Sequence, residues 1–165
     1  MIESFNNHFK DLCHNFKIEK RRFVLGLSGG IDSMALLHLL KNFIKLNKNL
    51  KIEIFPVIID HDLRLNSEHE ANAVLKIALS HGFKTIIKKI NIKKPSGNIQ
   101  NWARKERRRI LCDIAFDLSA NLLLGHHSDD QVETIFMRSI KGSGIDGLVG
   151  MQEKIVWNGM SIIRP

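Results

Sequence analysis

The segment from Ser28 to Ser33 has the residue types of an oxyanion-binding turn, because it reads Ser-Gly-Gly-Ile-Asp-Ser. Two adjacent glycines let the backbone approach an oxyanion closely, and the N–H groups that open a following helix point toward such a ligand. The carboxylate of Asp32 would repel a phosphate unless a divalent cation such as Mg²⁺ lies between them. The pattern therefore indicates a phosphate site shared with a metal. The plainer alternative is a glycine turn in which Ser33 caps a helix.

Two further segments carry side chains suited to chemistry. One runs from Asp60 to Arg64 and reads Asp-His-Asp-Leu-Arg, and the other runs from His126 to Glu133 and reads His-His-Ser-Asp-Asp-Gln-Val-Glu. Adjacent residues at the end of a strand point apart, so His126 and His127 are not expected to chelate one metal together. We therefore interpret His127 as a structural residue.

Apolar runs and helical patterns alternate along the chain. The apolar runs predict strands at residues 23–27, 52–59, 85–92 and 121–125. Helical patterns follow them, beginning near residues 32, 67, 98 and 128. This alternation is typical of an α/β domain with a doubly wound, mostly parallel sheet and right-handed crossovers. Residues 154–165 are expected to add one further strand.

Several residues predict where the helices begin and which face they bury. Ser67 to Glu70 and Ser128 to Gln131 match capping boxes, with the serines as N-caps, and Asn98 is a third N-cap. The helix from residue 32 is apolar on most of its surface, so we expect it to be buried. The apolar stripe expected for the helix after Asn98 consists of Ile99, Trp102, Ala103, Ile110, Ile114 and Leu118.

All three chemical segments directly follow a predicted strand. In doubly wound sheets, ligands bind beyond the carboxyl ends of the strands. We therefore expect residues 28–33, 60–64 and 126–133 to lie together at one edge of the sheet.

Length and composition fit one globular domain. The chain has 165 residues, of which 44% are hydrophobic and 25% charged, which excludes a disordered, collagen-like or coiled-coil protein. No apolar run approaches the roughly 18 residues that a membrane span needs, and the first ten residues are too polar for a signal peptide. Two cysteines suit a reducing compartment better than a disulfide framework. We expect a single cytoplasmic domain over residues 1–165, without a membrane partner.

The charge balance favours a polyanionic partner. Lysine and arginine outnumber aspartate and glutamate by 25 to 17, for a net charge of +8. Nucleic acid is the first candidate and an anionic membrane the second, while a solvated lysine-rich surface is the plainer alternative. Arg104, Arg107 and Arg108 fall on one helical face, and Lys105 and Arg109 share a neighbouring one. Such a face favours phosphate binding, and an ordinary solvated face is the plainer alternative.

The segment at residues 28–33 resembles the pyrophosphate loop of the N-type ATP pyrophosphatases, and it is neither a Walker A loop nor a GxGxxG turn. Residues 60–64 resemble the "DHGLR" segment of the tRNA(Ile)-lysidine synthetases, with Asp62 in place of the usual glycine. Residues 103–108 resemble their "ARxxRY" segment, with Arg108 where tyrosine is common.

The remaining motifs follow in the same order as in that family. Residues 125–134 match "GHHxDDQxET" at every fixed position, residues 141–151 follow "RGSG…GLxGM" closely, and residues 163–165 look like the start of "IRPLL". The resemblance runs from about Phe23 to the last residue.

This resemblance implies a PP-loop ATPase domain with the Rossmann-like fold of the adenine-nucleotide alpha-hydrolases. The implied reaction is the ligation of free L-lysine to C2 of the wobble cytidine in a CAU-anticodon tRNA(Ile), through an adenylated cytidine, with release of AMP and diphosphate. ATP and Mg²⁺ are the implied cofactors. Family members carry further C-terminal domains that grip tRNA, so we expect this chain to be a fragment that stops before them, and a homodimer is one expected assembly.

The resemblance also implies roles for individual residues. Asp32 and Asp130 would share Mg²⁺, and His126 would either donate to the α-phosphate or help a proton leave. Arg64 would contact tRNA or ATP, or else form a surface ion pair, and Glu133 would face the site or pair with a basic helix. The residues implied to bind the nucleotide are Ser28, Gly29, Gly30, Ile31, Asp32 and Ser33. The implied catalytic residues are Asp32, His126 and Asp130, and the further tRNA or ATP contacts are Arg64, Arg104 and Arg107.

Two alternatives stay open. One is another PP-loop enzyme that adenylates a tRNA base, such as a 2-thiolation enzyme, although Cys13 and Cys112 lack partners at the spacing that sulfur transfer or an iron–sulfur cluster needs. The other is a nucleotide- or RNA-binding module without catalysis. The presence of both Asp32 and Asp130 favours an enzyme, because a binding module has little use for a metal site with two carboxylates.

Overall fold

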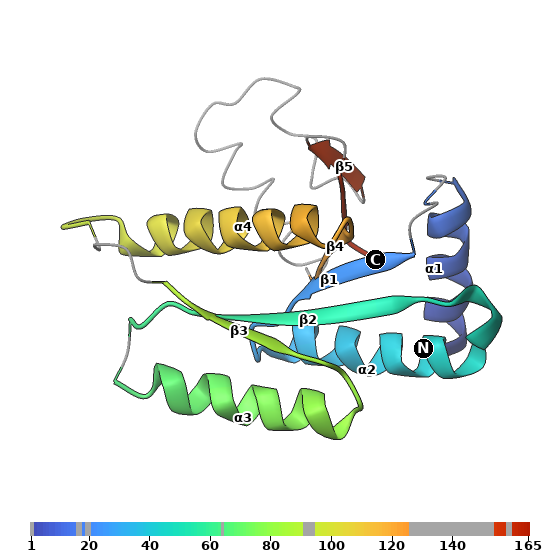
Figure 1. Ribbon diagram of the computed structural model, residues 1–165, viewed down its shortest axis with the longest axis horizontal. Coiled ribbons are helices and arrows are strands. Elements are labelled where there is room, and N and C mark those ends of the chain that lie inside the picture. The colour runs from blue at the N-terminus through green and yellow to red at the C-terminus, as the bar shows by residue number, and fades with distance from the viewer. Residues whose placement is uncertain are drawn as a thin grey trace.

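A computed structural model describes residues 2–15, 18, 21–63, 65–90, 95–125, 154–157 and 160–165. Within these residues the chain forms one six-stranded sheet with helices on both faces (Figure 1). The strands are β1 (Arg22–Gly26), β2 (Glu53–Asp60), β3 (Ile86–Lys89), β4 (Asn121–Leu124), β5 (Lys154–Trp157) and β6 (Met160–Ile163). The helices are α1 (Ile2–Asn15), α2 (Ile31–Leu46), α3 (Ser67–Ser80) and α4 (Ile99–Asp117), with a short 3-10 helix, η1 (Lys48–Leu50).

The sheet has the strand order β3-β2-β1-β4-β6-β5. All neighbouring strands pair in parallel except β5 and β6, which are antiparallel. This confirms the mostly parallel α/β sheet. The single strand expected over residues 154–165 is wrong, because this part of the chain forms two strands. The sequence Asn158-Gly159 between them is a strong hairpin signal that the expectation overlooked.

The helices lie in two layers, which confirms the doubly wound arrangement. In the view of Figure 1, α4 lies above the sheet and α2 and α3 lie below it. Side chains of β1 alternate between the two layers: Phe23 and Leu25 pack in the hydrophobic cluster of α1, α2 and α3, while Val24 packs in that of α4. Both faces of the strand are therefore buried, as its continuous apolar run requires.

Helix α1 is an element that the sequence analysis did not predict. Its apolar side chains are few, but Phe5, Phe9 and Leu12 recur at helical spacing. Phe9 is fully buried and meets the ring of Phe43, on α2, edge to face at 4.9 Å between centroids. The same ring lies 5.7 Å from that of Phe23, so aromatic contacts hold α1 against both β1 and α2.

Two helix starts differ from the expectation. The predicted N-cap at Ser67 is wrong, because the Glu70 N–H donates to the Asn66 carbonyl at 3.0 Å and the helix begins one residue earlier. Asn98 does precede α4, but its backbone is left-handed (φ +50°) and its side chain makes no capping bond. Gly82, with φ +87°, follows the C-cap residue of α3, where a left-handed glycine commonly ends a helix.

The buried faces of α2 and α4 are narrower than predicted. Helix α2 buries one face, and its first residue, Ile31, is 88% exposed. On α4, Ala103 is buried as expected, but Ile99 is 40% exposed. The residues of α4 that are buried against the sheet are Ala103, Leu111, Cys112 and Ala115. The orientation of a helix on its sheet decides this face, and residue spacing alone does not fix that orientation.

Arg22 secures the edge of the sheet at which the parallel strands begin. Its Nε donates to Glu53 Oε2 at 2.9 Å, and Nη1 donates to the Leu118 carbonyl at 2.7 Å. The guanidinium also lies over the ring of Phe55, 5.2 Å from its centroid. One side chain thereby joins β1, β2 and the end of α4.

The two cysteines lie in different layers of the fold. Cys13 packs beside the α1–α3 cluster and Cys112 lies within the α4 cluster, and both are free thiols. Burial raises the pKa of Cys13 to about 11 and raises the pKa of Cys112 as well. Among the described residues, none of the helices has the length and apolar composition to cross a bilayer.

Candidate active site

The loop from Ser28 to Ser33 joins β1 to α2 at the carboxyl edge of the sheet, as predicted. Its shape is fixed from within, since Ser33 Oγ donates to the Gly30 carbonyl at 2.9 Å and accepts from the Ser28 N–H at 3.3 Å. Gly29 has φ +80°, a conformation that favours glycine. Ser33 is 4% exposed. Its hydroxyl therefore holds the loop together. The exposed Ser28 hydroxyl takes part as well, since its Oγ lies 3.1 Å from Ser33 Oγ and accepts the Gly30 N–H at 3.3 Å.

The start of α2 can accept an anion. Gly30 is the N-cap and has no side chain, so no capping side chain satisfies the first N–H groups of α2. They carry the positive end of the helix dipole. Asp32, in the same turn, is exposed and has no ion pair within the described chain. One exposed carboxylate beside a phosphate site fits Mg²⁺, which is usually bound by one or two carboxylates together with substrate phosphates.

The end of β4 lies directly against this turn. A Cβ atom on Gly125 would come within 3.2 Å of Ser33 Cα and 3.3 Å of the Asp32 carbonyl group. Only glycine permits so close an approach without a shift of the backbone. The strand that precedes His126 in the sequence therefore ends beside Asp32.

Five of the residues assigned from the sequence fall outside the described residues, namely Arg64, His126, His127, Asp130 and Glu133, and so does the helix expected to begin near residue 128. The pairing of Asp32 with Asp130 on a metal accordingly stays a prediction. The described residues contain no group of three or more His, Cys, Asp and Glu side chains suited to hold a metal ion.

The loop after β2 is built around a buried carboxylate. Asp60 is 4% exposed, and its Oδ1 accepts the Asp62 N–H at 2.8 Å. This turn gives Asp62 a left-handed backbone, with φ +50°. Glycine adopts that conformation most readily and aspartate tolerates it, which explains why the resembling motif has glycine at this position. The role of Asp60 was not foreseen, although an aspartate two residues before a turn position is a recognised turn signal.

Arginines of α4 reach the loop after β2. Burial and the nearby Arg107 guanidinium lower the pKa of His61, against the opposite effect of Asp60. Burial and the charge of Arg104 in turn lower the pKa of Arg107. The Nδ1 atom of His61 is buried and has no hydrogen-bond partner among the described residues. The structure thus brings Arg107 beside His61 and Arg104 beside Arg107, so the two arginines form a cationic group near the end of β2.

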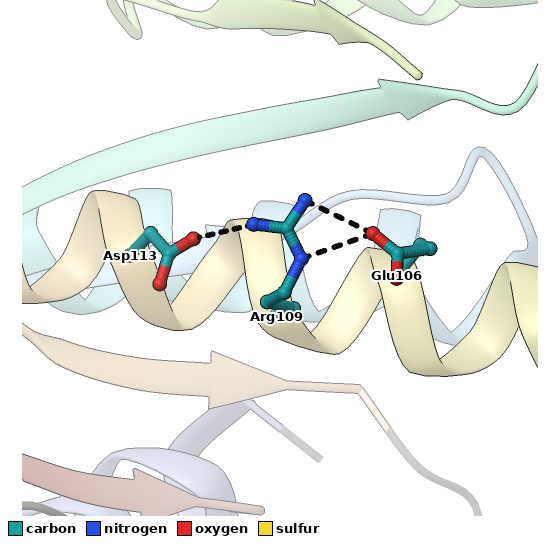
Figure 2. Close-up of polar contacts among 3 residues, drawn as sticks. All are labelled: Glu106, Arg109 and Asp113. Atoms are coloured by element: carbon teal, nitrogen blue, oxygen red, sulfur yellow. Dashed lines mark hydrogen bonds and ion pairs between the residues drawn. The ribbon is translucent and has the colours of Figure 1, made fainter. Parts of the chain in front are cut away.

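One neighbouring arginine is neutralised. Arg109 contacts Glu106 Oε2 through Nε at 3.0 Å and Nη2 at 2.9 Å, and Asp113 Oδ2 through Nη1 at 3.1 Å (Figure 2). In the described chain, Arg104, Arg107 and Arg108 have no such ion pair. The sequence analysis placed Arg109 on a neighbouring face but did not foresee these ion pairs, although Glu106 and Asp113 stand three and four residues from it.

A family model described as the PP-loop domain matches the chain over residues 1–165. The chain belongs to the PP-loop domain family. Membership in this family implies ATP binding, which agrees with the anion-accepting turn at the start of α2.

Curated relatives of this PP-loop domain carry the name tRNA(Ile)-lysidine synthase. One from Wolbachia pipientis wMel is 38% identical over 95% of this chain and 36% of its own length. One from Clostridioides difficile is 35% identical over 84% of this chain and 30% of its own length. One from Rickettsia rickettsii is 33% identical over 100% of this chain and 34% of its own length. The chain thus spans about a third of the length of these relatives.

A solved structure shares the fold of this PP-loop domain. The U34-tRNA thiolase NcsA from Methanococcus maripaludis superposes with a TM-score of 0.64 at 22% sequence identity. The match covers 76% of this chain and 44% of that one. It confirms the PP-loop α/β fold.

Proposed function

We propose that this PP-loop domain is the catalytic part of a tRNA(Ile)-lysidine synthetase, a ligase that forms a C–N bond. Its substrates would be ATP, free L-lysine and a tRNA(Ile) with a CAU anticodon. The proposal is supported by relatives of that name that are 33–38% identical over most of the chain. The cytoplasm as compartment and a homodimer as assembly belong to the same proposal.

The reaction proceeds in two steps. In the first, O2 of the wobble cytidine attacks the α-phosphorus of ATP, a P–O bond breaks and diphosphate leaves. In the second, the lysine amine attacks C2, the C2–O bond breaks, AMP leaves and the amine loses a proton. Negative charge develops on the α-phosphate and the leaving diphosphate, so preorganised donors at these oxygens lower the barrier.

The loop at residues 28–33 supplies such donors. The Ser28 hydroxyl and the N–H groups of the first turn of α2 bind the diphosphate portion of ATP. Asp32 and Asp130 would hold Mg²⁺, which would supply further positive charge at these oxygens. His126 donates to the α-phosphate or accepts a proton. These roles of Asp130 and His126 rest on the motif resemblance.

Arg104 and Arg107 bind the tRNA in this proposal. They lie beside the end of β2 and lack ion pairs in the described chain, and burial together with their mutual repulsion lowers the pKa of Arg107. A phosphate between them would relieve that repulsion. Arg64, two positions after Asp62, is proposed as a further contact with tRNA or ATP.

The contact of Gly125 with Asp32 and Ser33 carries the proposal most directly. It requires β4, the strand before His126 and Asp130 in the sequence, to end against the loop at residues 28–33. If β4 ended elsewhere, the two motifs could not contribute to one site. A PP-loop enzyme needs the two segments at one edge of the sheet.

The test is incorporation of labelled lysine into a CAU-anticodon tRNA(Ile) transcript in the presence of Mg-ATP. We expect label in this transcript and none in one with a different wobble base. Asp32→Asn should reduce incorporation by about a hundredfold, because it removes the charge that a divalent cation needs. Pyrophosphate release with sulfur incorporation, or ATP binding without pyrophosphate release, would contradict the lysidine reaction.

The thiolation alternative finds no support in the positions of the cysteines. Cys13 and Cys112 lie in clusters on opposite faces of the sheet, and burial raises the pKa of both. A sulfur carrier needs a reactive, accessible thiolate, which burial disfavours.

A further inference from the structure

We propose that Arg108 and Arg164 form a second phosphate-binding site, which takes a backbone phosphate of the RNA substrate beside the candidate active site. The proposal rests on the proposed function for the identity of the RNA. Together with Arg104 and Arg107 near the end of β2, this site would form a row of cationic side chains that reaches the end of β6.

The register of β6 places Arg164 at the carboxyl edge on the α4 side. Leu123 pairs with Ile163, so Arg164 is the next residue past the end of β6 and is level with Leu124. Ile162 packs in the α4 cluster, and side chains alternate along a strand. Arg164, two residues later, therefore lies on the same face as α4.

Arg108 reaches the same place from α4. It precedes Leu111 and Cys112 by about one turn, and these two pack against Ile162 in one cluster. Burial lowers the pKa of Arg164, and the charge of Arg108 lowers it further. Two guanidinium groups from different elements thus share one region, although like charges repel.

Counter-charge for Arg108 is missing in the described chain. Arg108 is exposed and forms no ion pair there, while Glu106 and Asp113 on the same helix both bind Arg109 (Figure 2). An anion between Arg108 and Arg164 would offset their repulsion. Guanidinium groups suit phosphate, because their planar donors match two of its oxygens at once.

The extent of the cationic residues favours RNA over a single nucleotide. His61 and Arg107 lie at the end of β2, and Arg164 lies at the end of β6. Strands β2 and β6 are three strand spacings apart in the sheet, which is roughly 14 Å. An extended polyanion can meet both ends of this row, and the net charge of +8 agrees with such a ligand.

The test compares Arg108→Gln with Arg109→Gln, which removes the same charge from the next residue of the helix. Binding to the CAU-anticodon tRNA(Ile) transcript is measured for the full chain at several salt concentrations. We expect Arg108→Gln to weaken binding about fivefold and to reduce the slope of log affinity against log salt by roughly 0.7 to 0.9, the value for one phosphate contact. Arg109→Gln should leave the slope unchanged, and Arg108→Lys should retain it.

Further measurements test the role of Arg164 and the identity of the ligand. Arg164→Gln should lower the slope as Arg108→Gln does, and the double variant should add little, because both residues would serve one phosphate. Because Arg164 is half-buried, the folding of its variant is checked by circular dichroism. Arg108 is exposed, so its variant still tests the site if Arg164→Gln fails to fold. ATP affinity should not change in Arg108→Gln.

Several results would overturn the inference. They are an unchanged salt slope in Arg108→Gln, an equal change in Arg109→Gln, no measurable RNA binding by the chain, or a loss of ATP affinity in place of RNA affinity. Lysine incorporation by the unaltered chain reports separately on the proposed function. Incorporation together with an unchanged slope in Arg108→Gln would reject the second phosphate site alone, and a reduced slope without incorporation would reject the lysidine reaction alone.

Discussion

Gly125 at the end of β4 and Ser33 in the first turn of α2 are in such close contact that a Cβ atom on Gly125 would come within 3.2 Å of Ser33 Cα. The neighbouring atoms belong to the backbone of Asp32 and Ser33, so no side-chain rotation can relieve the contact. The separation of β4 and α2 at the carboxyl edge therefore depends on the absence of one side chain.

Gly125→Ala should impair ATP-dependent activity more than stability. The added methyl pushes the first turn of α2 away from β4 and misplaces its N–H donors, and displacements on this scale cost about tenfold or more in rate. Lysine incorporation and ATP affinity measure the effect. Gly97→Ala is the control, because a Cβ atom there meets nothing within 4 Å. Equal losses in the two variants would contradict the role of the contact.

Comparison of Gly29→Ala with Gly82→Ala should separate the destabilisation caused by backbone strain from a loss of ATP binding. Both glycines have left-handed backbones, with φ +80° and +87°. Alanine at each position should destabilise the fold by about 1–2 kcal/mol, with a further cost at Gly29 because its Cβ would come within 2.7 Å of Val74 Cγ2. Urea denaturation measures the stability of both variants. ATP titration should show a loss for Gly29→Ala alone, and a similar loss in Gly82→Ala would refute the assignment.

The stability of the fold should fall when His61 is protonated. Burial and Arg107 lower its pKa in the folded state, whereas the unfolded chain takes up the proton near pH 6.5. The unfolded state then binds more protons, so stability decreases as the pH falls from about 6.5 toward the lower folded pKa. His61→Gln should lose less stability between pH 7.5 and 5.5 than the unaltered chain. His81, whose pKa is also lowered, contributes equally to both proteins and cancels in the difference.

Arg107→Gln should raise the pKa of His61, because it removes a nearby positive charge. Titration of the His61 ring protons by NMR measures the change. Arg109→Gln is the matched control, since Arg109 is already bound to Glu106 and Asp113. An unchanged His61 pKa in Arg107→Gln would mean that the two side chains are not neighbours.

Substitutions of Asp62 should reveal the left-handed turn after β2. Asp62→Gly suits φ +50°, and the side-chain contact with Lys89 that it removes is exposed and 3.5 Å long, so we expect stability within about 0.5 kcal/mol of the original. Asp62→Val should destabilise by about 1–2 kcal/mol, because a β-branched residue fits that conformation poorly. Urea denaturation of the two variants decides the matter, and equal stabilities would argue against the turn.

Sequence periodicity was sufficient to predict β1 and β2, the strands that lead into the candidate site. The apolar runs before Ser28 and Asp60 predicted β1 and β2 closely, because both strands are buried on both faces and leave a continuous signal. The rule that ligands bind at carboxyl ends then placed the loop at residues 28–33 correctly. Those inferences depend on local sequence and on one property of all parallel sheets.

Features set by tertiary packing were not predicted. The contact of Gly125 with Ser33 joins residues far apart in the sequence, and nothing near Gly125 signals it. The same holds for the burial of Leu111 against the sheet and for the proximity of Arg107 to His61. The pairing of Arg109 differs from these, since its partners lie three and four residues away and a closer reading of the helix would have found them.

Because Arg109 is bound by two carboxylates while Arg104, Arg107 and Arg108 are not, the electric field of α4 is stronger toward the carboxyl edge than around Arg109. A polyanion that approaches from solution is attracted preferentially to that edge, so its encounters begin in an orientation close to the bound one. Such steering increases association rates at low ionic strength and fades as salt screens the charges. The division of charge along one helix thus bears on how fast a ligand arrives as well as on how tightly it is held.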